Sequence, residues 1–485
     1  QNLDPTTLSI TNSLTDVRAE NLFFNLGFDY QDKYIFEGLV RRDGSSLFGE
    51  NERYQVFYRA TAAYRITEDI TIPGINELKV RGSYGTSGSR PGFAAQYETF
   101  NLSRGVASKA VLGNPDLKPS RISEFEFGVN ATFLNKFNFE FNYADISADD
   151  QILLVPLPGV AGFSSQWRNA GLVTTKALEF SLGSYIKDTQ DFSWDFNIVA
   201  SNAISKVERL DVPPLLRGDG ITSGMFRIQE GEEFGVMYGN RFAKSADDFI
   251  LDQNGFITNI SGYVPGSANN KTPEQFVRNS DGYMIPVGTE YTSGETAVLL
   301  YDPETGQKLD AKIGNSRPDL ILGLNQNIRY KNFALFVLLD AQIGGDIYNS
   351  SRQNMYFQER HGDLDQAGKP EGQRKAATYY SSAVSLYNGA TPSEHFVEKA
   401  TYMKLREVAL NYRLDNAFMQ RVGLGNVLQD AKISLIGRNL LTFTDYSGFD
   451  PEVASLSAGD PTTFRSDAYV YPMFRTFTAA IEVRF

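Results

Sequence analysis

Apolar and polar residues alternate with a period of two along several short stretches of the chain. In the last stretch the apolar positions are Phe477, Ala479, Ile481, Val483 and Phe485. Successive side chains of a β-strand point to opposite faces, so this pattern predicts a strand with one apolar and one mostly polar face. The same alternation recurs at residues 125–133 and 137–143, where Phe and Tyr alternate mainly with Glu and Asn. We therefore predict an all-β fold.

Short connections join several of the predicted strands. Asn135-Lys136 and Lys331-Asn332 each separate two alternating stretches, as expected of tight hairpin turns. Residues 31–33 and 187–191 predict two further hairpins. Aromatic pairs flank three of the turns, namely Tyr30 with Tyr34, Phe133 with Phe137, and Tyr330 with Phe333. Aromatic girdles at the interfaces of a transmembrane barrel have this arrangement.

The other connections are long and rich in Gly, Ser, Asn, Asp and Pro, which predicts loops. They cover about residues 86–120, 150–172, 205–317, 345–400 and 446–472. Short turns that alternate with long loops are typical of outer-membrane barrels, whose turns are periplasmic and whose loops are extracellular. Residues 415–429 break the rule, because they stand in place of a short turn and predict a small helix. A soluble β-sandwich or propeller would also give alternating strands, but the aromatic flanks and the two loop lengths favour the membrane barrel.

The composition narrows the class of protein further. About 13 or 14 strands are predicted, with Thr6–Thr11 as an optional first one. The sequence has no run of about 18 apolar residues, so no transmembrane helix is predicted. The N-terminus does not resemble a signal peptide. The chain has no cysteine and two histidines, so thiolate chemistry is excluded and a histidine-rich metal site is not expected. A net charge of −12 argues against a nucleic-acid partner.

Several phrases of the sequence, taken in order, point to one family. They are Arg41–Gly49, Gly113–Lys118, Asn169–Gly171 with Ala177–Glu179, Pro318–Phe333, Tyr402–Arg406 with Asn411-Tyr412, Arg438–Leu440 and Gly448–Glu452. Each phrase is short, but together they reach from about Arg18 to Phe485. In this order they resemble the SusC-like, TonB-dependent transporters of the Bacteroidetes outer membrane.

The resemblance implies a transmembrane antiparallel β-barrel of about 22 strands, of which this chain would supply the C-terminal 13 or 14. A TonB-interacting segment and a plug domain are not visible, so we expect a portion of a longer receptor. Open sheet edges leave backbone amides unsatisfied in lipid, so the remaining strands must come from elsewhere. The implied location is the outer membrane, with the chain crossing it many times and a periplasmic C-terminus.

The resemblance also implies a function and partners. A SusD-like surface lipoprotein would cap the loops, and the TonB complex would supply energy through the absent N-terminal part. The cargo would be an oligosaccharide or an oligopeptide. A passive porin, an adhesin-like barrel and a structural subunit of a larger outer-membrane complex remain alternatives. An all-β glycoside hydrolase is a further one, although we expect no enzyme, since no catalytic arrangement stands out around His361 or His395.

Two groups of residues are candidates for contact with a solute. The polar face of the predicted hairpins would line the lumen through Glu124, Glu126, Asn130, Glu140, Asn142, Asp195 and Asn197. Paired glycosidase carboxylates are the alternative for the glutamates. Extracellular loop aromatics are the second group, with Tyr238, Phe242, Tyr356, Phe357, Tyr379 and Tyr380. The alternative is that they form small cores of the loops themselves.

Two further features carry expectations. Outer-membrane barrels in general end on an aromatic residue, which implies that Phe485 is recognised by the barrel-assembly machinery, while anchoring at the lipid interface is the simpler role. Many members of the resembling family carry an Asp-rich, calcium-loop-like stretch before the Pro318 hairpin. Here only Asp302 and Glu304 stand in that stretch, so an ordinary turn is favoured over a weak calcium site. No other cofactor is expected.

Overall fold

The computed structural model describes residues 16–103, 106–218, 220–452 and 464–485. The optional strand at Thr6–Thr11 lies outside these residues. In the described ranges, none of the helices has both the length and the apolar composition needed to cross a membrane.

Long strands dominate the described chain. Thirteen of them form one sheet, in the order β1-β2-β3-β4-β8-β9-β12-β13-β20-β21-β24-β25-β27. Their bounds are Ala19–Tyr30, Tyr34–Ser45, Tyr54–Arg65, Ile75–Ser89, Ser120–Phe133, Phe137–Asp149, Leu172–Asp188, Phe192–Arg209, Leu320–Tyr330, Phe333–Ile343, Tyr402–Leu414, Asp430–Thr444 and Thr476–Arg484. Each long strand therefore pairs with the long strand before it in sequence, as in a meander. This arrangement confirms the all-β, antiparallel prediction.

The short turns explain how the predicted hairpins close. Leu134 and Asn135 both have positive φ, at 53° and 55°, and Lys136 N donates to Phe133 O at 3.1 Å. Two successive positive φ angles define a type I′ turn, whose twist matches that of the flanking strands. The central residues are thus Leu134 and Asn135, one position before the predicted Asn135-Lys136. The turn at Lys331-Asn332 lies where it was predicted, between β20 and β21.

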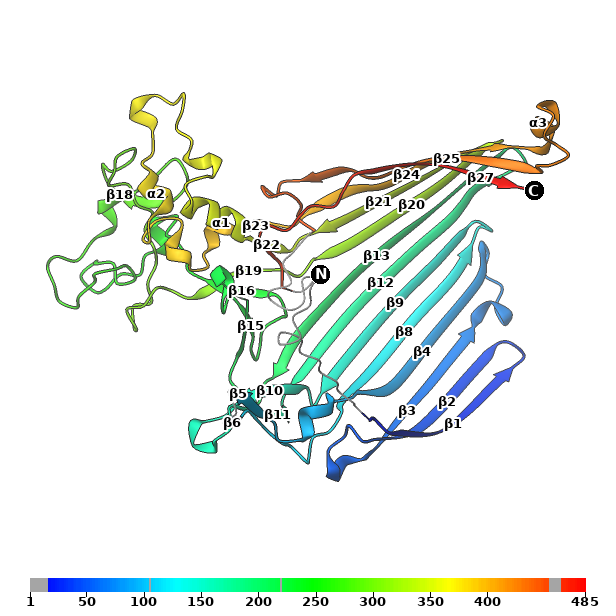
Figure 1. Cartoon of the computed structure of the whole chain (residues 1–485), viewed down its shortest axis with the longest axis horizontal. Helices are drawn as coiled ribbons and strands as arrows, with labels where there is room; N and C mark the ends of the chain where they lie inside the picture. The colour runs from blue at the N-terminus through cyan, green and yellow to red at the C-terminus, as the bar shows by residue number, and fades with distance from the viewer. Residues whose placement is uncertain (1–15, 104–105, 219, 453–463) are drawn as a thin grey trace, which may run out of the picture. The chain divides into compact units, whose positions relative to one another are not determined.

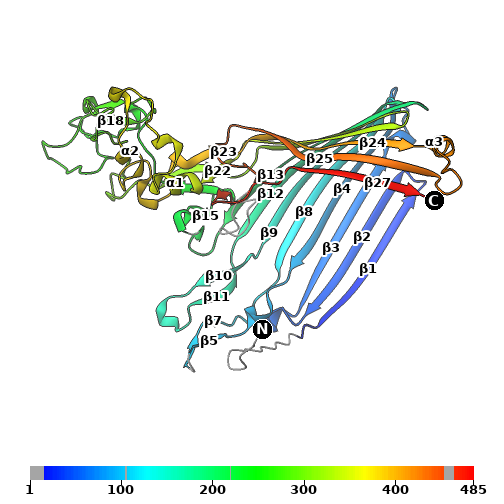
Figure 2. The same ribbon diagram turned by 45° about the horizontal axis from the view of Figure 1, so that its top comes forward.

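The chain divides into two compact units. The first comprises residues 1–131, 142–176 and 207–213, and Figure 2 shows its strands β1 to β4 side by side. Two predicted loops of this unit, 86–120 and 150–172, contain short strands of their own. These are β5 (Phe100–Ser103), β6 (Val106–Lys109), β7 (Val111–Leu112), β10 (Ile152–Pro156) and β11 (Ser165–Asn169). β7, β10 and β11 form a small sheet, so the two loops are ordered against each other.

The second unit comprises residues 132–141, 177–206 and 214–485. Its long loops, residues 214–317 and 345–400, are called the loop lobe here. The lobe contains β14 (Leu215–Arg217), β15 (Phe226–Ile228), β16 (Val236–Gly239), β17 (Phe276–Arg278), β18 (Met284–Pro286), β19 (Ala311–Asn315), β22 (Asp346–Asn349), β23 (Val397–Lys399), α1 (Ser350–Phe357) and α2 (Ala377–Ser381). β26 (Ser466–Asp467) pairs with β22.

The lobe and the short turns of this second unit lie at opposite ends of its strands. Figure 1 shows α1, α2 and β18 at one end of β20, β21 and β24, and α3 (Asn416–Arg421) at the other. α3 confirms the small helix predicted within residues 415–429. Its N-cap Asp415 accepts the amide of Phe418 at 2.9 Å. The unit therefore has one end of long loops and one of short connections, as in an outer-membrane barrel.

One face of the sheet is continuously apolar. In the second unit a row of directly paired residues crosses six strands, namely Trp194, Ile328, Leu335, Leu410, Leu435 and Ala479. Leu410 and Leu435 are 42% and 55% exposed. A soluble protein would bury such a row, whereas a barrel turns it toward lipid. The apolar face is therefore the outer one and the polar face lines the inside.

Strand β24 changes its phase half-way along. Its pairing with β21 passes from Leu405 with Leu339 directly to Glu407 with Leu338, so Arg406 is the extra residue of a β-bulge against β21. Against β25 the extra residue lies on β25, since Asn439 and Leu440 stand opposite Arg406. Before the bulge Leu405 lies on the apolar face, and after it Val408 and Leu410 do. The bulge therefore allows Arg406 and Glu407, two consecutive residues, to lie on the polar side.

Candidate functional site

An arginine organises the polar face of β4 and β8 in the first unit. Arg81 of β4 donates to Glu126 Oε1 at 2.6 Å and to Asn130 Oδ1 at 3.3 Å, both on β8. It also donates to Asn142 of β9. The structure thus brings together three of the predicted lumen residues around a cation that the sequence reasoning missed. The sequence could have indicated this residue, because Arg81 lies on the same polar face of its strand as Lys79 and Ser83.

Gly128 makes room for this arginine. A Cβ atom at Gly128 would lie 2.7 Å from Arg81 Nε and 2.9 Å from Asn142 Oδ1. A side chain at Gly128 would therefore require the guanidinium of Arg81 to move from this position. Glu124 and Glu140 lie on the same polar faces as Glu126 and Asn142, two positions along their strands. The glutamates thus form part of a charged wall rather than an isolated carboxylate pair.

The other predicted lumen residues belong to an amide-rich patch of the second unit. Asp195 and Asn197 of β13 pair directly with Asn327 and Asn325 of β20. Asn327 Nδ2 donates to Asp195 Oδ2 at 2.8 Å, and Ser181 Oγ of β12 donates to Asn197 Oδ1 at 3.1 Å. Side-chain amides offer both donors and acceptors, so this patch suits a polar, uncharged solute.

Two charged residues of β24 hold the turn after β25 against the polar face. Lys404 Nζ lies 2.6 Å from Asp450 Oδ1 and 2.7 Å from Glu452 Oε2. Arg406 donates to both carboxylate oxygens of Glu452, at 2.7 Å each, and to Asp340 of β21. Lys404 is only 2% exposed. We call these five residues the wall clamp. It joins two phrases that the sequence analysis singled out separately, Tyr402–Arg406 and Gly448–Glu452.

The stability of the wall clamp should depend on pH through the ionisation of Glu452. Its hydrogen bonds to Arg406 and Lys404 outweigh its burial and lower its pKa to about 2. Because the pKa of Glu452 is lower in the folded state than its unfolded value of about 4.3, the ionised carboxylate stabilises the folded state at pH values above about 4.3. This stabilisation is lost as the pH falls toward 2. We expect a spin label at Phe449, which is 71% exposed, to become mobile between about pH 4 and pH 2. A label at Tyr471 is the control, and equal mobility changes at both positions would contradict the expectation.

Most of the predicted loop aromatics are core residues. Phe242, Tyr356, Tyr379 and Tyr380 are between 0% and 6% exposed and pack in one hydrophobic cluster of the loop lobe. This burial corrects the expectation that they contact a solute, because their rings are covered by the lobe itself. A lobe of this size needs its own core, and its aromatics supply it. Phe357 is 53% exposed and stacks on Tyr387, while Tyr238 lines a pocket.

Both histidines of the chain enter one hydrogen-bond network in the loop lobe. His395 lies 2.7 Å from the Tyr283 hydroxyl and 3.2 Å from that of Tyr356. Tyr356 donates to Asp363, whose carboxylate is 3.3 Å from His361. Burial lowers the pKa of His395 to about 3, so its imidazole is neutral near pH 7. His361 is thus engaged with Asp363 and is more than a solvated loop residue.

The stretch that holds the weak calcium candidates forms a hydrogen-bonded turn. Asp302 Oδ1 accepts the amides of Glu304 at 2.8 Å and Thr305 at 3.2 Å. An aspartate that accepts amides two and three residues ahead makes an Asx turn, as the alternative interpretation expected. Across the ranges that the structure describes, no three acidic, histidine or cysteine side chains are placed to hold a metal ion.

Comparison with known proteins shows what this chain is similar to. Residues 1–211 match the family described as TonB dependent receptor-like, beta-barrel. The chain is 26% identical to TonB-dependent receptor P3 of Formosa agariphila, over 99% of this chain and 47% of that protein. It is 23% identical to TonB-dependent receptor SusC of Bacteroides thetaiotaomicron, over 96% and 43%. The chain thus spans about half the length of the curated relatives it matches.

Solved structures show the same fold. The RagAB peptide importer in its open-open state aligns with a TM-score of 0.69 and 21% identity, over 100% of this chain and 49% of that chain. Its closed-closed state gives a TM-score of 0.68 over 96% and 47%. The matched proteins are receptors and transporters, in agreement with the expectation that the chain is not an enzyme. Together with the sheet and its apolar face, these matches show that the chain has the fold of a large part of such a β-barrel and is similar in sequence to the SusC-like TonB-dependent receptors.

Proposed function

We propose that the chain is the C-terminal barrel portion of an energy-coupled importer for oligosaccharides or oligopeptides. The observation that carries the proposal is the polar inner face, where Arg81, the amide patch at Asp195 and Asn197, and the wall clamp present charged and amide groups. Such a face suits a large polar solute. RagAB is a peptide importer, which supports an oligopeptide as the cargo, while the resemblance to SusC-like transporters leaves an oligosaccharide open.

Energy coupling is tested by uptake in cells. A strain that lacks the gene of the receptor should lose uptake of its oligomeric cargo, and a strain that lacks TonB should lose it equally. Growth on defined oligosaccharides and oligopeptides as sole nutrients gives the readout. Uptake that survives the loss of TonB would favour a passive porin. Unchanged growth on every oligomer after deletion would favour a structural subunit.

We also propose a SusD-like lipoprotein on the extracellular loops. The loop lobe supports this, since it is large, has its own aromatic core, and lies at the end of its strands away from the short turns. The receptor purified from outer membranes under mild detergent should carry this lipoprotein with it. Deleting residues 367–374, which are exposed on the lobe, should release it if this segment is the contact. Retention of the lipoprotein would refute a contact through that segment.

The same proposal gives the orientation of the barrel in the membrane and the place where further strands would complete it. The C-terminus and the short turns would be periplasmic, the loop lobe extracellular, and TonB would act through a plug encoded before this chain. β1 and β27 are the outermost strands of the described sheet and are exposed along their length. Further strands would pair with these edges, because lipid leaves an unpaired backbone amide unsatisfied. Outer-membrane lipids would surround the apolar face.

Phe485 is proposed as a signal for the barrel-assembly machinery. It follows β27 directly and is 74% exposed. We expect Phe485→Ser to reduce the heat-modifiable, folded fraction in outer membranes several-fold. Phe477→Ser is the matched control, since Phe477 lies near the start of β27 and is 76% exposed. An equal reduction in both variants would indicate lipid anchoring alone.

A further inference from the structure

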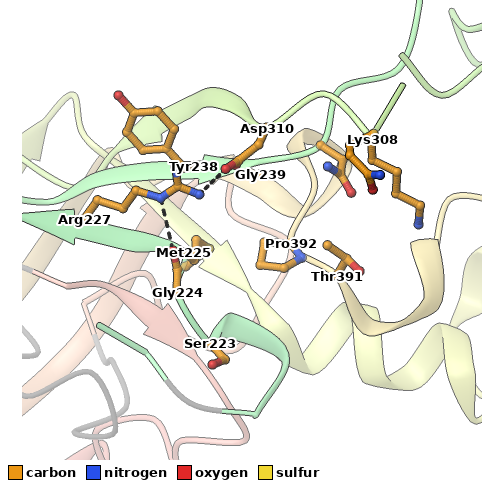
Figure 3. A pocket seen from close by; sticks show the side chains of 12 residues that line it. Ser223, Gly224, Met225, Arg227, Tyr238, Gly239, Lys308, Asp310, Thr391 and Pro392 are labelled. Carbon is orange, nitrogen blue, oxygen red and sulfur yellow. Dashed lines mark hydrogen bonds and ion pairs between the residues drawn. The ribbon is translucent and has the colours of Figure 1, made fainter. Parts of the chain in front are cut away.

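The loop lobe contains a polar pocket that none of the preceding functions uses. Its volume is about 400 Å³, within the range of roughly 300–1,000 Å³ typical of small-molecule sites. Figure 3 shows Arg227 and Lys308 on different sides of it, with Thr391 and Pro392 between them. Residues from β15, β16, the segment before β19 and the segment after α2 build its wall. The pocket therefore depends on the folded lobe rather than on one loop.

The two cations of the pocket differ in their partners. Arg227 pairs with Asp310, and its guanidinium lies 4.5 Å from the centre of the Tyr238 ring. Its charge is thus compensated within the protein. Lys308 Nζ donates to the amide oxygen of Asn388 at 2.7 Å, and no carboxylate of the described residues lies within ion-pair distance of it. Burial lowers the pKa of Lys308, as expected of an ammonium that loses water without gaining a counter-charge.

The surroundings of Lys308 hold it in place. Asn388 is fully buried and donates to Asn240 Oδ1 at 2.8 Å, and Asn240 donates to the Leu309 carbonyl at 2.9 Å. The ammonium has three N–H donors, of which Asn388 takes one. A positioned, partly buried cation with donors to spare is what a carboxylate needs for a charge-assisted hydrogen bond.

The rest of the pocket offers neutral polar groups. Among the described residues, the hydroxyls of Ser223 and Thr391 and the side-chain amide of Gln307 have no hydrogen-bond partner and line the pocket. Hydroxyl and amide groups around a cation match a solute that carries many hydroxyls and one acid. We propose that this pocket binds a carboxylate-bearing sugar unit, with Lys308 as the counter-charge of the acid. The sugar would belong to the proposed cargo, so its origin rests on the proposed function, whereas the binding itself does not.

The test uses the complete receptor, purified in detergent, and two probes, one with free carboxylates and one with the same carboxylates methylated. An oligogalacturonate should bind at least about 10-fold more tightly than its methyl ester, because one charged hydrogen bond is lost in the ester. Lys308→Gln should remove this preference for the acid over the ester. Lys308→Arg keeps the charge and should retain the preference. The matched control is Lys312→Gln, since Lys312 is half-exposed and already paired with Glu232 at 3.1 Å.

Four results would overturn the proposal. They are a lack of binding by both sugar probes, equal affinity for acid and ester, an equal loss in Lys312→Gln and Lys308→Gln, or tighter binding of an acidic peptide (N-acetyl-Gly-Glu-Gly-amide) than of the sugar acid. Heat-modifiable mobility of each variant verifies its fold. Binding is measured without transport, so a failure here leaves the proposed import standing, and a failure of uptake in cells leaves this site standing.

Discussion

Lys404→Met is expected to destabilise the receptor more than any other single replacement of a charged residue in the described barrel wall. The variant leaves Asp450, which is 5% exposed, without its cation at 2.6 Å. Removing one partner of a buried ion pair costs about 3–5 kcal/mol, because the remaining charge is neither solvated nor compensated. The free energy of unfolding, measured by denaturant titration of the complete receptor in lipid vesicles, gives the readout.

Two comparisons separate this effect from a general loss of positive charge. Lys432→Met on β25 removes a cation that is 45% exposed and paired with Glu482, so it should cost less than about 1 kcal/mol. The double variant Lys404→Met with Asp450→Asn should recover part of the loss, since the orphaned charge is gone. If Lys432→Met lowers the free energy of unfolding as much as Lys404→Met does, the wall clamp does not stabilise the barrel more than an exposed ion pair does.

Leu410→Arg should give the second large effect. Leu410 lies in the apolar row of the outer face and is 42% exposed. A charged residue on the lipid face of a barrel costs about 2–4 kcal/mol at the middle of the membrane and less near its interfaces. We expect a loss of this order in the same vesicle titration, together with a smaller folded fraction in outer membranes.

The adjacent residue is the matched control. Asn411 lies on the opposite, polar face and pairs with Ala334 and Ser434. Asn411→Arg introduces the same side chain one residue later in the chain, so it should change the free energy of unfolding by no more than about 1 kcal/mol. A larger loss in Asn411→Arg than in Leu410→Arg would mean that the apolar face is the inner one.

Local features of the sequence predicted the strands, their turns and α3. The alternation at residues 125–143 and the aromatic flanks of Lys331-Asn332 depend on neighbours in the chain, which a sequence displays directly. The slip of one residue at Leu134 has a local cause as well. A leucine rarely adopts positive φ, so nothing marked it as a central turn residue.

Contacts between segments far apart in the chain could not be predicted from the sequence. Arg81 meets Glu126, 45 positions later, and Lys404 meets Asp450, 46 positions later. Alternation assigns each residue to a face but does not say which residues are level with one another. For the loop aromatics no periodicity exists, so Tyr356 and Tyr379 gave no sign of whether water or other side chains surround them. Their burial is a property of the assembled lobe.

The bulge at Arg406 bears on how such a wall can change over evolutionary time. A one-residue insertion in a membrane strand would ordinarily turn every later side chain to the wrong face. Against β21 the extra residue Arg406 is instead confined to the bulge, and Val408 and Leu410 beyond it stay on the apolar side. A single inserted codon could therefore add a charged contact to the lumen while the lipid-facing half of the strand kept its reading frame. Barrel walls of this kind can acquire new inward chemistry without rebuilding their outer surface.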